Sequence, residues 1–251
     1  VEELAALMER QGINIQLGAD VDEIVLERKR ATGVRLSSGE VLNADLVVFG
    51  GDPETCYKHL LPAKKTFSLP TIKKRYSMGL YVLYFGTRKL YPDVAHHSIW
   101  MGPRFQELLS EIFDSKKMSE DFSLYVHRPT ATDSSFAPEG CESFYVLCPV
   151  PNLLGDINWE TEGPVLRDRI IQSLEETILP ELSSVIEEVF WMTPEDFASD
   201  YRSMHGAGFS IEPRLTQSAW FRFHNRDRAI SNLYFVGAGT HPGAGLPGVV
   251  S

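Results

Sequence analysis

The chain has 251 residues, of which 43% are hydrophobic, 23% charged and 11% aromatic. This composition is ordinary for a globular protein and argues against disorder, collagen and coiled coil. Lys and Arg number 24 and Asp and Glu number 34, so the formal net charge is −10. Because phosphate contacts need a dense basic surface, we expect no nucleic-acid partner. No apolar run approaches the roughly 20 residues that a membrane-spanning helix needs.

The cysteines are few: Cys56, Cys141 and Cys148 form no Cys-x-x-Cys pair, and their number is odd. These features argue against the disulfide framework of a small secreted protein and against a metal site built on thiolates. We expect thiols that are buried or idle.

Both ends of the chain have the pattern of an interrupted helix. Residues 1–11 predict an amphipathic helix that ends before Gly12, yet no N-cap residue precedes it. Residues 246–251 begin like a helix, with Pro247 suited to the first turn, and stop after one turn. We expect this chain to be an internal part of a longer protein.

The first quarter of the chain predicts short strands separated by turns. The apolar run at residues 44–49 is typical of a strand buried on both faces of a parallel or mixed sheet, and the glycine turn 50–53 follows it. This order indicates the later part of a nucleotide-binding α/β domain. The expected strands are residues 13–17, 21–26, 34–36 and 44–49, with turns at 31–33 and 37–40.

The middle of the chain predicts an antiparallel sheet with flanking helices, because its strands are rich in β-branched and aromatic residues and its helices show 3.6-residue spacing. The expected strands are residues 80–85, 122–126 and 143–147, and the expected helices are 103–113, a long one that opens at Gly163-Pro164 and is broken by Pro180, and one capped by Thr193 with Pro194 in its first turn.

The densest chemical signal lies between Asn232 and Gly248, where an apolar strand ending at Val236 runs into five glycines and then into a helix start. Glycines let the backbone pass close to a ligand and adopt positive φ. A helix start offers free N–H groups and a partial positive charge, so this segment suits an anion or an electron-rich ring edge. The alternative is a glycine-rich turn that is needed only for packing.

Several stretches of this sequence resemble the FAD-dependent carotenoid phytoene desaturases of the bacterial and fungal type. The resemblance runs over nearly the whole chain, and the long string of matches makes it specific. The stretches that carry it are residues 232–249, 215–227, 121–141, 83–86 and 95–97.

The resemblance implies an α/β (mixed α+β) fold, part of a two-domain fold similar to that of the flavin amine oxidases. It implies that residues 1–53 form part of an FAD-binding, Rossmann-like domain that is incomplete here. Residues 54–210 then form an antiparallel-sheet substrate domain, and residues 211–251 return to the FAD-binding domain, truncated in its last helix. The FAD contacts that it implies are Val21, through its backbone to the adenine, and Gly237, Gly239, Thr240, Gly245, Leu246, Pro247 and Gly248.

The resemblance also implies an activity: FAD-dependent desaturation of a carotenoid precursor such as phytoene, by hydride transfer from a C–C unit to the flavin, in carotenoid biosynthesis. The implied partners are an apolar isoprenoid substrate and an electron acceptor, oxygen or quinone. Because the substrate lives in a bilayer, we expect peripheral contact with the cytoplasmic side of the membrane, and we expect this part of the protein alone to be inactive. Two alternatives stay open: a carotenoid cis–trans isomerase on the same scaffold, and a flavin-free prenyl-lipid escort module.

Two further groups of side chains leave alternatives open. By residue type, His96, His97, His127, His205 and His241 are possible proton acceptors, with surface or satisfied core histidines as the alternative. Because successive strand residues face opposite sides, we expect His96 and His97 not to share a metal. The strands of the middle region carry aromatic residues that fit either a packed core or the wall of a tunnel for a polyene: Tyr81, Tyr84, Phe85, Phe122, Tyr125, Phe144 and Tyr145.

Overall fold

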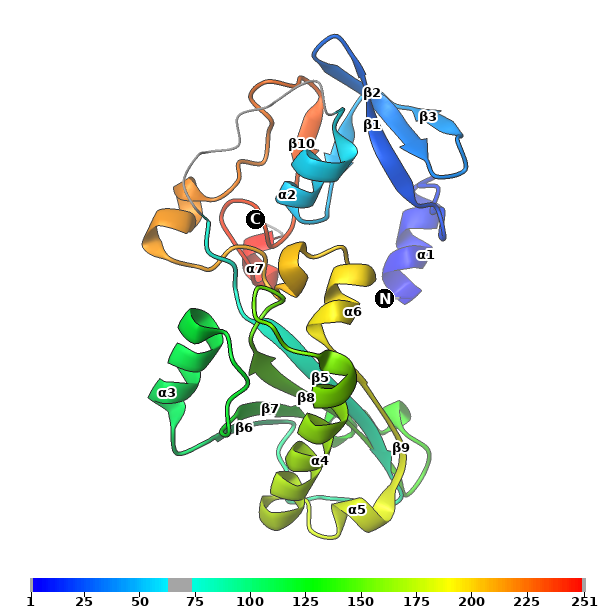
Figure 1. Cartoon of the computed structure of the whole chain (residues 1–251). Helices are drawn as coiled ribbons and strands as arrows, with labels where there is room; N and C mark the ends of the chain where they lie inside the picture. Colours follow the sequence, from blue (N-terminus) through cyan, green and yellow to red (C-terminus); the bar gives the residue numbers. More distant parts are fainter. Residues whose placement is uncertain (1, 63–73, 250–251) are drawn as a thin grey trace. The chain divides into compact units, whose positions relative to one another are not determined.

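The computed structural model describes residues 2–62 and 74–249. Contacts divide the chain into two compact units: the first unit comprises residues 1–71 and 224–236, and the second unit comprises residues 72–223 and 237–251. Both units are drawn in Figure 1, and each is described by itself. The domain boundaries that we predicted after residues 53 and 210 stay a prediction, while the contacts change unit after residues 71, 223 and 236.

Helix α1 (Glu2–Arg10) opens the first unit, as predicted. The loop that follows exposes Ile13, Ile15 and Leu17, and the strand predicted over residues 13–17 is wrong. An alternating pattern forms a strand only where a neighbouring strand supplies backbone partners. Among the described residues, none pairs with this loop.

Three antiparallel strands in the order β1-β2-β3 form the larger sheet of the first unit. The predicted turn at residues 31–33 is wrong, because the second strand runs straight through Gly33. A Cβ atom at Gly33 would lie 2.1 Å from the carbonyl oxygen of Leu42, so glycine here permits a close approach of two strands. The strands are β1 (Val21–Glu27), β2 (Arg30–Leu36) and β3 (Val41–Asn43).

A two-stranded parallel sheet joins β4 (Val47–Phe49) to β10 (Leu233–Phe235) in the same unit. Val47, Leu233 and Phe235 are buried in its core, but Val48 is 57% exposed. The prediction that residues 44–49 form a strand buried on both faces is therefore wrong, since this small sheet has apolar packing on one side only.

Side chains from both ends of the chain complete the core of the first unit. The short helix α2 (Pro53–Thr55) continues into a π-helical turn, Cys56–Leu60. The hydroxyl of Tyr57 donates to the carboxylate of Asp227 at 2.6 Å, and the other carboxylate oxygen accepts from the backbone amide of Ala229 at 2.7 Å. This carboxylate therefore ties the loop before β10 to the early part of the chain.

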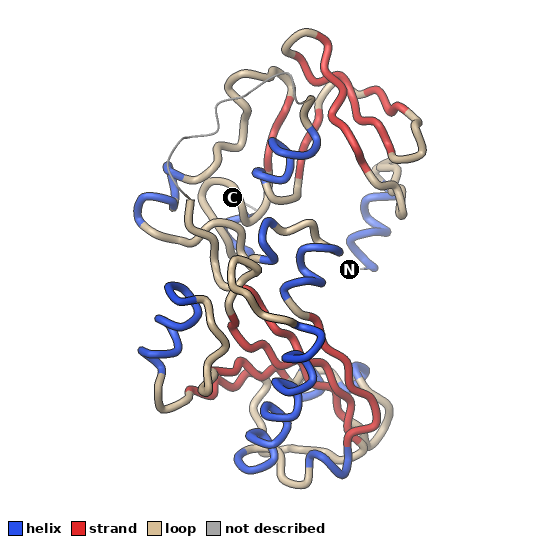
Figure 2. The backbone as a smooth tube through the Cα atoms, in the orientation of Figure 1, coloured by secondary structure: helices blue, strands red, loops and turns tan. Residues whose placement is uncertain are grey.

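The second unit is built on a five-stranded antiparallel sheet in the order β6-β7-β8-β5-β9, as predicted for the middle region. Figure 2 shows these strands in red. Two of them, the edge strands β6 and β9, were not among the expected strands. The bounds are β5 (Gly79–Thr87), β6 (His97–Met101), β7 (Ser123–His127), β8 (Glu142–Val150) and β9 (Ile186–Met192).

Helix α4 (Trp159–Thr177) packs its apolar stripe, which includes Leu166, Ile170 and Leu174, against one face of this sheet (Figure 1). The helix begins earlier than predicted because the side chain of Asn158 accepts hydrogen bonds from the amides of Glu160 and Thr161, as an N-cap does. Gly163 therefore lies inside the helix and does not open it.

The predicted cap at Thr193 is confirmed. The hydroxyl of Thr193 accepts from the amide of Glu195 and the carboxylate of Asp196 accepts from the amide of Thr193, which is a complete capping box. The predicted helix 103–113 is α3 (Phe105–Ser110) followed by a π-helical turn, Glu111–Ser115, which ends two residues later than predicted. The remaining helices are α5 (Leu182–Val185), α6 (Pro194–Ser199) and α7 (Leu246–Val249).

None of the helices in the described ranges combines the length and the apolar character needed to cross a membrane.

Candidate functional site

The glycine segment, residues 237–249, follows β10 and belongs to the second unit. Three of its glycines have positive φ: Gly237 at 97°, Gly243 at 141° and Gly245 at 109°. L-residues with a side chain rarely adopt these values. The backbone of this segment therefore takes a path that needs glycine.

The alternative reading, a turn whose glycines are needed only for packing, does not fit Gly243 and Gly245. A Cβ atom built on Gly245 meets nothing within 4 Å, and one on Gly243 makes only ordinary contact, 3.7 Å from Cδ of Arg222. Both positions have room for a side chain. Glycine is needed at these positions because the backbone adopts positive φ. Since glycine has no side chain, the backbone here is accessible to a ligand.

Bare amides cluster at the end of this segment. Ala244, Gly245 and Leu246 are exposed, and within the described part of the chain their backbone amides donate no hydrogen bond. Helix α7 begins at Leu246, as predicted, and includes Pro247 and Gly248. Three unpaired N–H groups in succession suit an anion or a carbonyl-rich ring edge.

The start of the segment is held rigidly. Thr240 is buried, and its hydroxyl donates to the carbonyl oxygen of Gly237 at 2.8 Å. The amide of Thr240 donates to the same oxygen at 3.1 Å, and the next amide, that of His241, donates to the carbonyl of Phe223 at 2.7 Å. Thr240 is thus a structural support of the turn, while the exposed amides lie beyond it.

Arg222 is the main anchor of the glycine segment. Its buried guanidinium donates from Nε to the carbonyl oxygen of Ala238 at 2.9 Å. The other nitrogens donate to three carbonyl oxygens of one preceding loop, those of Phe209, Ile211 and Gln217, at 3.0–3.3 Å. One side chain therefore links the glycine segment to residues 209–217.

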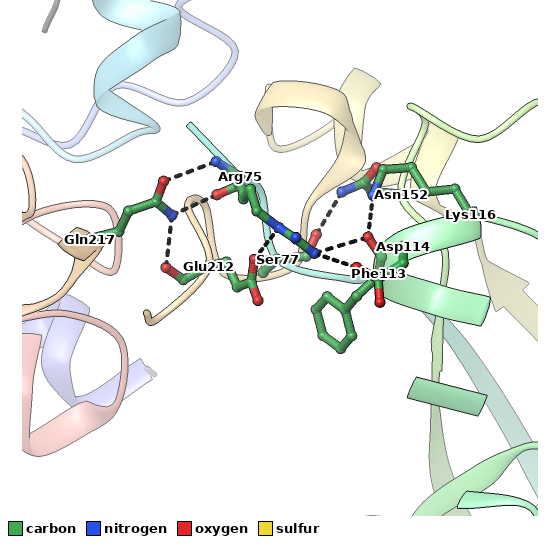
Figure 3. Close-up of polar contacts among 8 residues, drawn as sticks. All are labelled: Arg75, Ser77, Phe113, Asp114, Lys116, Asn152, Glu212 and Gln217. Atoms are coloured by element: carbon green, nitrogen blue, oxygen red, sulfur yellow. Dashed lines mark hydrogen bonds and ion pairs between the residues drawn. The ribbon is translucent and has the colours of Figure 1, made fainter. Parts of the chain in front are cut away.

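Arg75 also holds this loop, as Figure 3 shows. The side-chain amide of Gln217 accepts from the Arg75 amide and donates to the Arg75 carbonyl, both at 2.9 Å, like one rung of a sheet. The guanidinium of Arg75 pairs with the carboxylate of Glu212 at 2.9 Å and donates to that of Asp114 at 3.0 Å. These two carboxylates raise the pKa of Arg75, with the Asp114 hydrogen bond as the largest cause.

A second set of contacts, of which Figure 3 draws the one between Asn152 and Ser77, fixes the chain just after Arg75. The side chain of Asn152 donates to the carbonyl of Ser77 at 2.8 Å, and the hydroxyl of Ser77 accepts from the amide of Phe209 at 2.9 Å. Residues 75–77, which lead into β5, and residues 209–217 are therefore held together by side-chain amides, a hydroxyl and ion pairs.

A cavity of about 550 Å³ lies in the second unit, lined by residues 114–118, residues 154–158 and Glu162. Most of these side chains are polar or charged, so the cavity does not suit a hydrocarbon.

The sheet of the second unit separates its aromatic residues onto two faces. Tyr81, Phe85, Phe122 and Phe144 belong to the buried core beside α4. The opposite face carries what we call the aromatic face: Tyr84, Tyr125, Tyr145 and Phe190. Tyr84 stacks on Phe190 with ring centroids 4.7 Å apart, and Tyr145 makes edge contacts with Tyr84 at 5.4 Å and with Tyr125 at 6.1 Å. Three of the expected aromatic residues are thus available to line a wall.

The remaining predicted site residues are spread over both units. Val21 begins β1 in the first unit, where it is half-buried and opposes Leu36. Gly239 lies in the glycine segment next to Thr240. His205 contacts the ring of Tyr76, and His241 is an exposed residue within the glycine segment. The predicted contacts of Val21 and of the glycine segment with FAD stay predictions.

One expectation about histidines is wrong. His96 and His97 do not face opposite sides, since their ring centroids are 4.2 Å apart, and His127 joins them. Strand β6 begins only at His97, so the alternation of a strand does not apply across this junction.

Arg222, Gln217 and Arg75 were not predicted as site residues. Arg222 and Gln217 fall within the stretch 215–227 that carries the resemblance, but their partners lie at residues 238 and 75, and no local spacing reveals such contacts. The burial of Arg222 and Gln217 is visible only in the folded chain.

Residues 1–251 match the family described as flavin containing amine oxidoreductase. A lycopene-forming phytoene desaturase of Paracoccus sp. is 51% identical, over 98% of this chain and 50% of that protein. A lycopene-forming phytoene desaturase of Pseudescherichia vulneris is 48% identical, over 96% and 50%, and a neurosporene-forming one of Rhodobacter capsulatus is 45% identical, over 98% and 49%. The predicted resemblance is confirmed, and the chain spans about half the length of the curated relatives it matches.

Among solved structures, the chain is similar to an oxidoreductase from Methanosarcina mazei, with a TM-score of 0.59 and 16% identity over 99% of this chain and 50% of that one. At this identity the likeness shows the fold alone. With the family match it confirms the predicted fold class, a mixed α/β part of a flavin amine oxidase-like fold.

Proposed function

The chain belongs to the flavin containing amine oxidoreductase family, and on this premise we propose that it is the middle and late part of an FAD-dependent enzyme that desaturates a carotenoid precursor such as phytoene. A flavin cofactor follows from the family, and its FAD form is part of the proposal. The observation that carries the proposal is the glycine segment, whose exposed amides at Ala244, Gly245 and Leu246 have no partner in the described chain.

The residues present fit a flavin dinucleotide. Gly245 has both the positive φ and the open space that a close-lying ligand needs. Gly237, Gly239 and Thr240 would follow the pyrophosphate and ribityl chain, and Gly245, Leu246, Pro247 and Gly248 the pyrimidine edge. Val21 would meet the adenine through its backbone. When bound, the flavin supplies the two-electron acceptor that removal of a hydride needs.

The residues of the protein hold the glycine segment in place and orient its backbone amides toward the cofactor. Arg222 fixes the carbonyl of Ala238, so the bare amides beyond it keep one direction. Amides that are already oriented stabilise negative charge near them without reorganisation. The Arg75–Gln217 rung keeps the loop that carries Arg222's acceptors in place.

The aromatic face supports a hydrocarbon substrate. Tyr84, Tyr125 and Tyr145 are half-buried and Phe190 is 59% exposed, so apolar ring surface is available on this side of the sheet. A polyene is a long apolar chain without hydrogen-bonding groups, and aromatic walls bind such chains through area alone. We propose that this face forms one wall of the substrate site.

An apolar substrate of this kind resides in a bilayer, and peripheral contact with the cytoplasmic side of the membrane is therefore part of the proposal. Oxygen or a quinone is the proposed electron acceptor. Phe105 and Leu109 of α3 expose apolar surface that suits such contact.

The test is expression of the full-length protein in bacteria that accumulate phytoene, followed by absorption and mass spectra of the extracted pigment. The proposal predicts products with longer conjugation, each new double bond lowering the mass by two hydrogen atoms. An isomerase would leave the mass unchanged, and an escort protein would be purified without a flavin chromophore. Either outcome would overturn the proposal.

A further inference from the structure

Three imidazoles gather at one edge of the sheet in the second unit. His97, the first residue of β6, is paired across the strands with His127, the last residue of β7. His96 directly precedes β6, and its carbonyl oxygen accepts from the amide of Arg128 at 2.9 Å. One ring nitrogen from each of the three histidines lies within 4.8 Å of the other two.

The closest pair of nitrogens is arranged head to head. Nε2 of His96 lies 2.7 Å from Nε2 of His127, and the two ring planes differ by only 13° with centroids 4.8 Å apart. Two neutral imidazole nitrogens that point at each other can share one proton in an N–H···N hydrogen bond, or both can present a lone pair to a cation. This is the geometry in which a cation takes the place of a proton.

Two of the three histidines have a partner on the outer nitrogen that fixes the ring. Nδ1 of His96 is hydrogen-bonded to the hydroxyl of Thr132. Nδ1 of His97 is hydrogen-bonded to the hydroxyl of Tyr125 at 2.8 Å. Histidines that bind metals have such partners on their second nitrogen, which set the tautomer and the orientation of the ring.

Imidazoles bind metals in their neutral form, and an uncompensated cation beside them opposes that binding. The adjacent cation, Arg128, is paired with Glu142, so its charge is offset.

We propose that His96, His97 and His127 form a binding site for one divalent cation of the Zn²⁺, Ni²⁺ or Cu²⁺ type. Imidazole suits these ions, and three imidazoles leave a fourth position for water. Zinc–nitrogen bonds of about 2.0–2.1 Å in tetrahedral geometry place the nitrogens roughly 3.3 Å apart, so the His96 and His127 nitrogens separate by a small ring movement. The bound ion would connect the edge strand β6 to β7.

The test uses the tag-free full-length protein, with Zn²⁺ titrated against a chromophoric chelator and Co²⁺ followed by its visible d–d absorption. We expect one ion per chain, and we expect His96→Gln, His97→Gln and His127→Gln each to weaken binding by more than about 100-fold. Tyr125→Phe should weaken it by about tenfold, since only the outer partner is lost. His59→Gln, at an exposed histidine of the first unit, is the matched control and should change nothing.

The wild-type protein must also show tetrahedral Co²⁺ bands, a readout that does not depend on any variant remaining folded. Folding of each variant is checked by circular dichroism. Absence of saturable binding in the wild type, or an equal loss in His59→Gln, would overturn the proposal. So would an unchanged affinity in the three folded histidine variants.

Discussion

The guanidinium Nε of Arg222 lies 2.9 Å from the carbonyl oxygen of Ala238 and donates to it, and the remaining nitrogens of Arg222 hold the carbonyls of Phe209, Ile211 and Gln217. This one side chain connects the loop at 209–217 to the start of the glycine segment. The position of the exposed amides at residues 244–246 therefore depends on Arg222, a residue outside the glycine segment.

Replacement of Arg222 by Gln should destabilise the protein strongly. The change removes charged donors from four carbonyl groups, two of them in buried hydrogen bonds, and we expect a loss of about 3 kcal/mol or more in the free energy of unfolding. Urea unfolding followed by tryptophan fluorescence measures it. Arg214→Gln, at an exposed arginine eight residues earlier, is the control and should stay within about 0.5 kcal/mol of the wild type. A loss below about 1 kcal/mol at Arg222 would contradict the anchoring role.

The two faces of the sheet should respond differently to the loss of a ring. Replacement of Phe85, which is buried beside α4, by Ala should lower the free energy of unfolding by about 3–5 kcal/mol. Replacement of Phe190, which is largely exposed and stacked on Tyr84, by Ala should lower the free energy of unfolding by only about 1 kcal/mol. Phe190→Ala should instead lower pigment formation about tenfold, as expected when roughly 1.4 kcal/mol of apolar contact with the substrate is lost.

For Phe190→Ala, thermal unfolding measures the loss of stability, and the pigment yield in phytoene-accumulating cells measures the loss of pigment formation. Unchanged pigment formation by the folded variant would show that the aromatic face is not a substrate wall.

Stability should fall in alkaline solution because of buried thiols. Burial raises the pKa of Cys148 from 9.0 to about 12, so in the unfolded chain this thiol loses its proton at lower pH than in the folded protein. The contribution of the protonated Cys148 thiol to the free energy of unfolding is complete below pH 9. It is lost as the pH rises, by about 1 kcal/mol between about pH 9 and 10. Cys148→Ala should show a shallower decline in the free energy of unfolding from about pH 8 to 10 than the wild type, and parallel curves would refute this origin.

Local signals in the sequence predicted local structure well. Thr193 with Asp196 forms the capping box that Thr-Pro-Glu-Asp indicates, and the runs rich in β-branched and aromatic residues at 80–85 and 143–147 lie within β5 and β8. Where the outcome depended on a distant partner, the pattern failed. Residues 13–17 alternate but form no strand, and β9, with two adjacent glutamates, lacks alternation yet completes the sheet edge beside β5.

The site shows the same division. The glycines were identifiable because positive φ is a property of single residues, as Gly245 shows. Arg222 was not, because its acceptors come from separate loops. The histidine cluster depends on the register that places His97 opposite His127, and the expectation of alternation between His96 and His97 failed because β6 starts between them.

The central claim is that the bare main chain at Gly245 meets a flavin, and a matched pair of glycines tests it most directly. Gly245 and Gly140 both have positive φ, 109° and 78°, and neither has an atom within 4 Å of an added Cβ. Alanine at either position should cost about 1–3 kcal/mol of stability through the same backbone strain. In the full-length protein, Gly245→Ala should lose flavin affinity by at least tenfold while Gly140→Ala keeps it, measured as bound flavin per chain and by fluorescence titration. Equal flavin affinity in the two folded variants would contradict the claim.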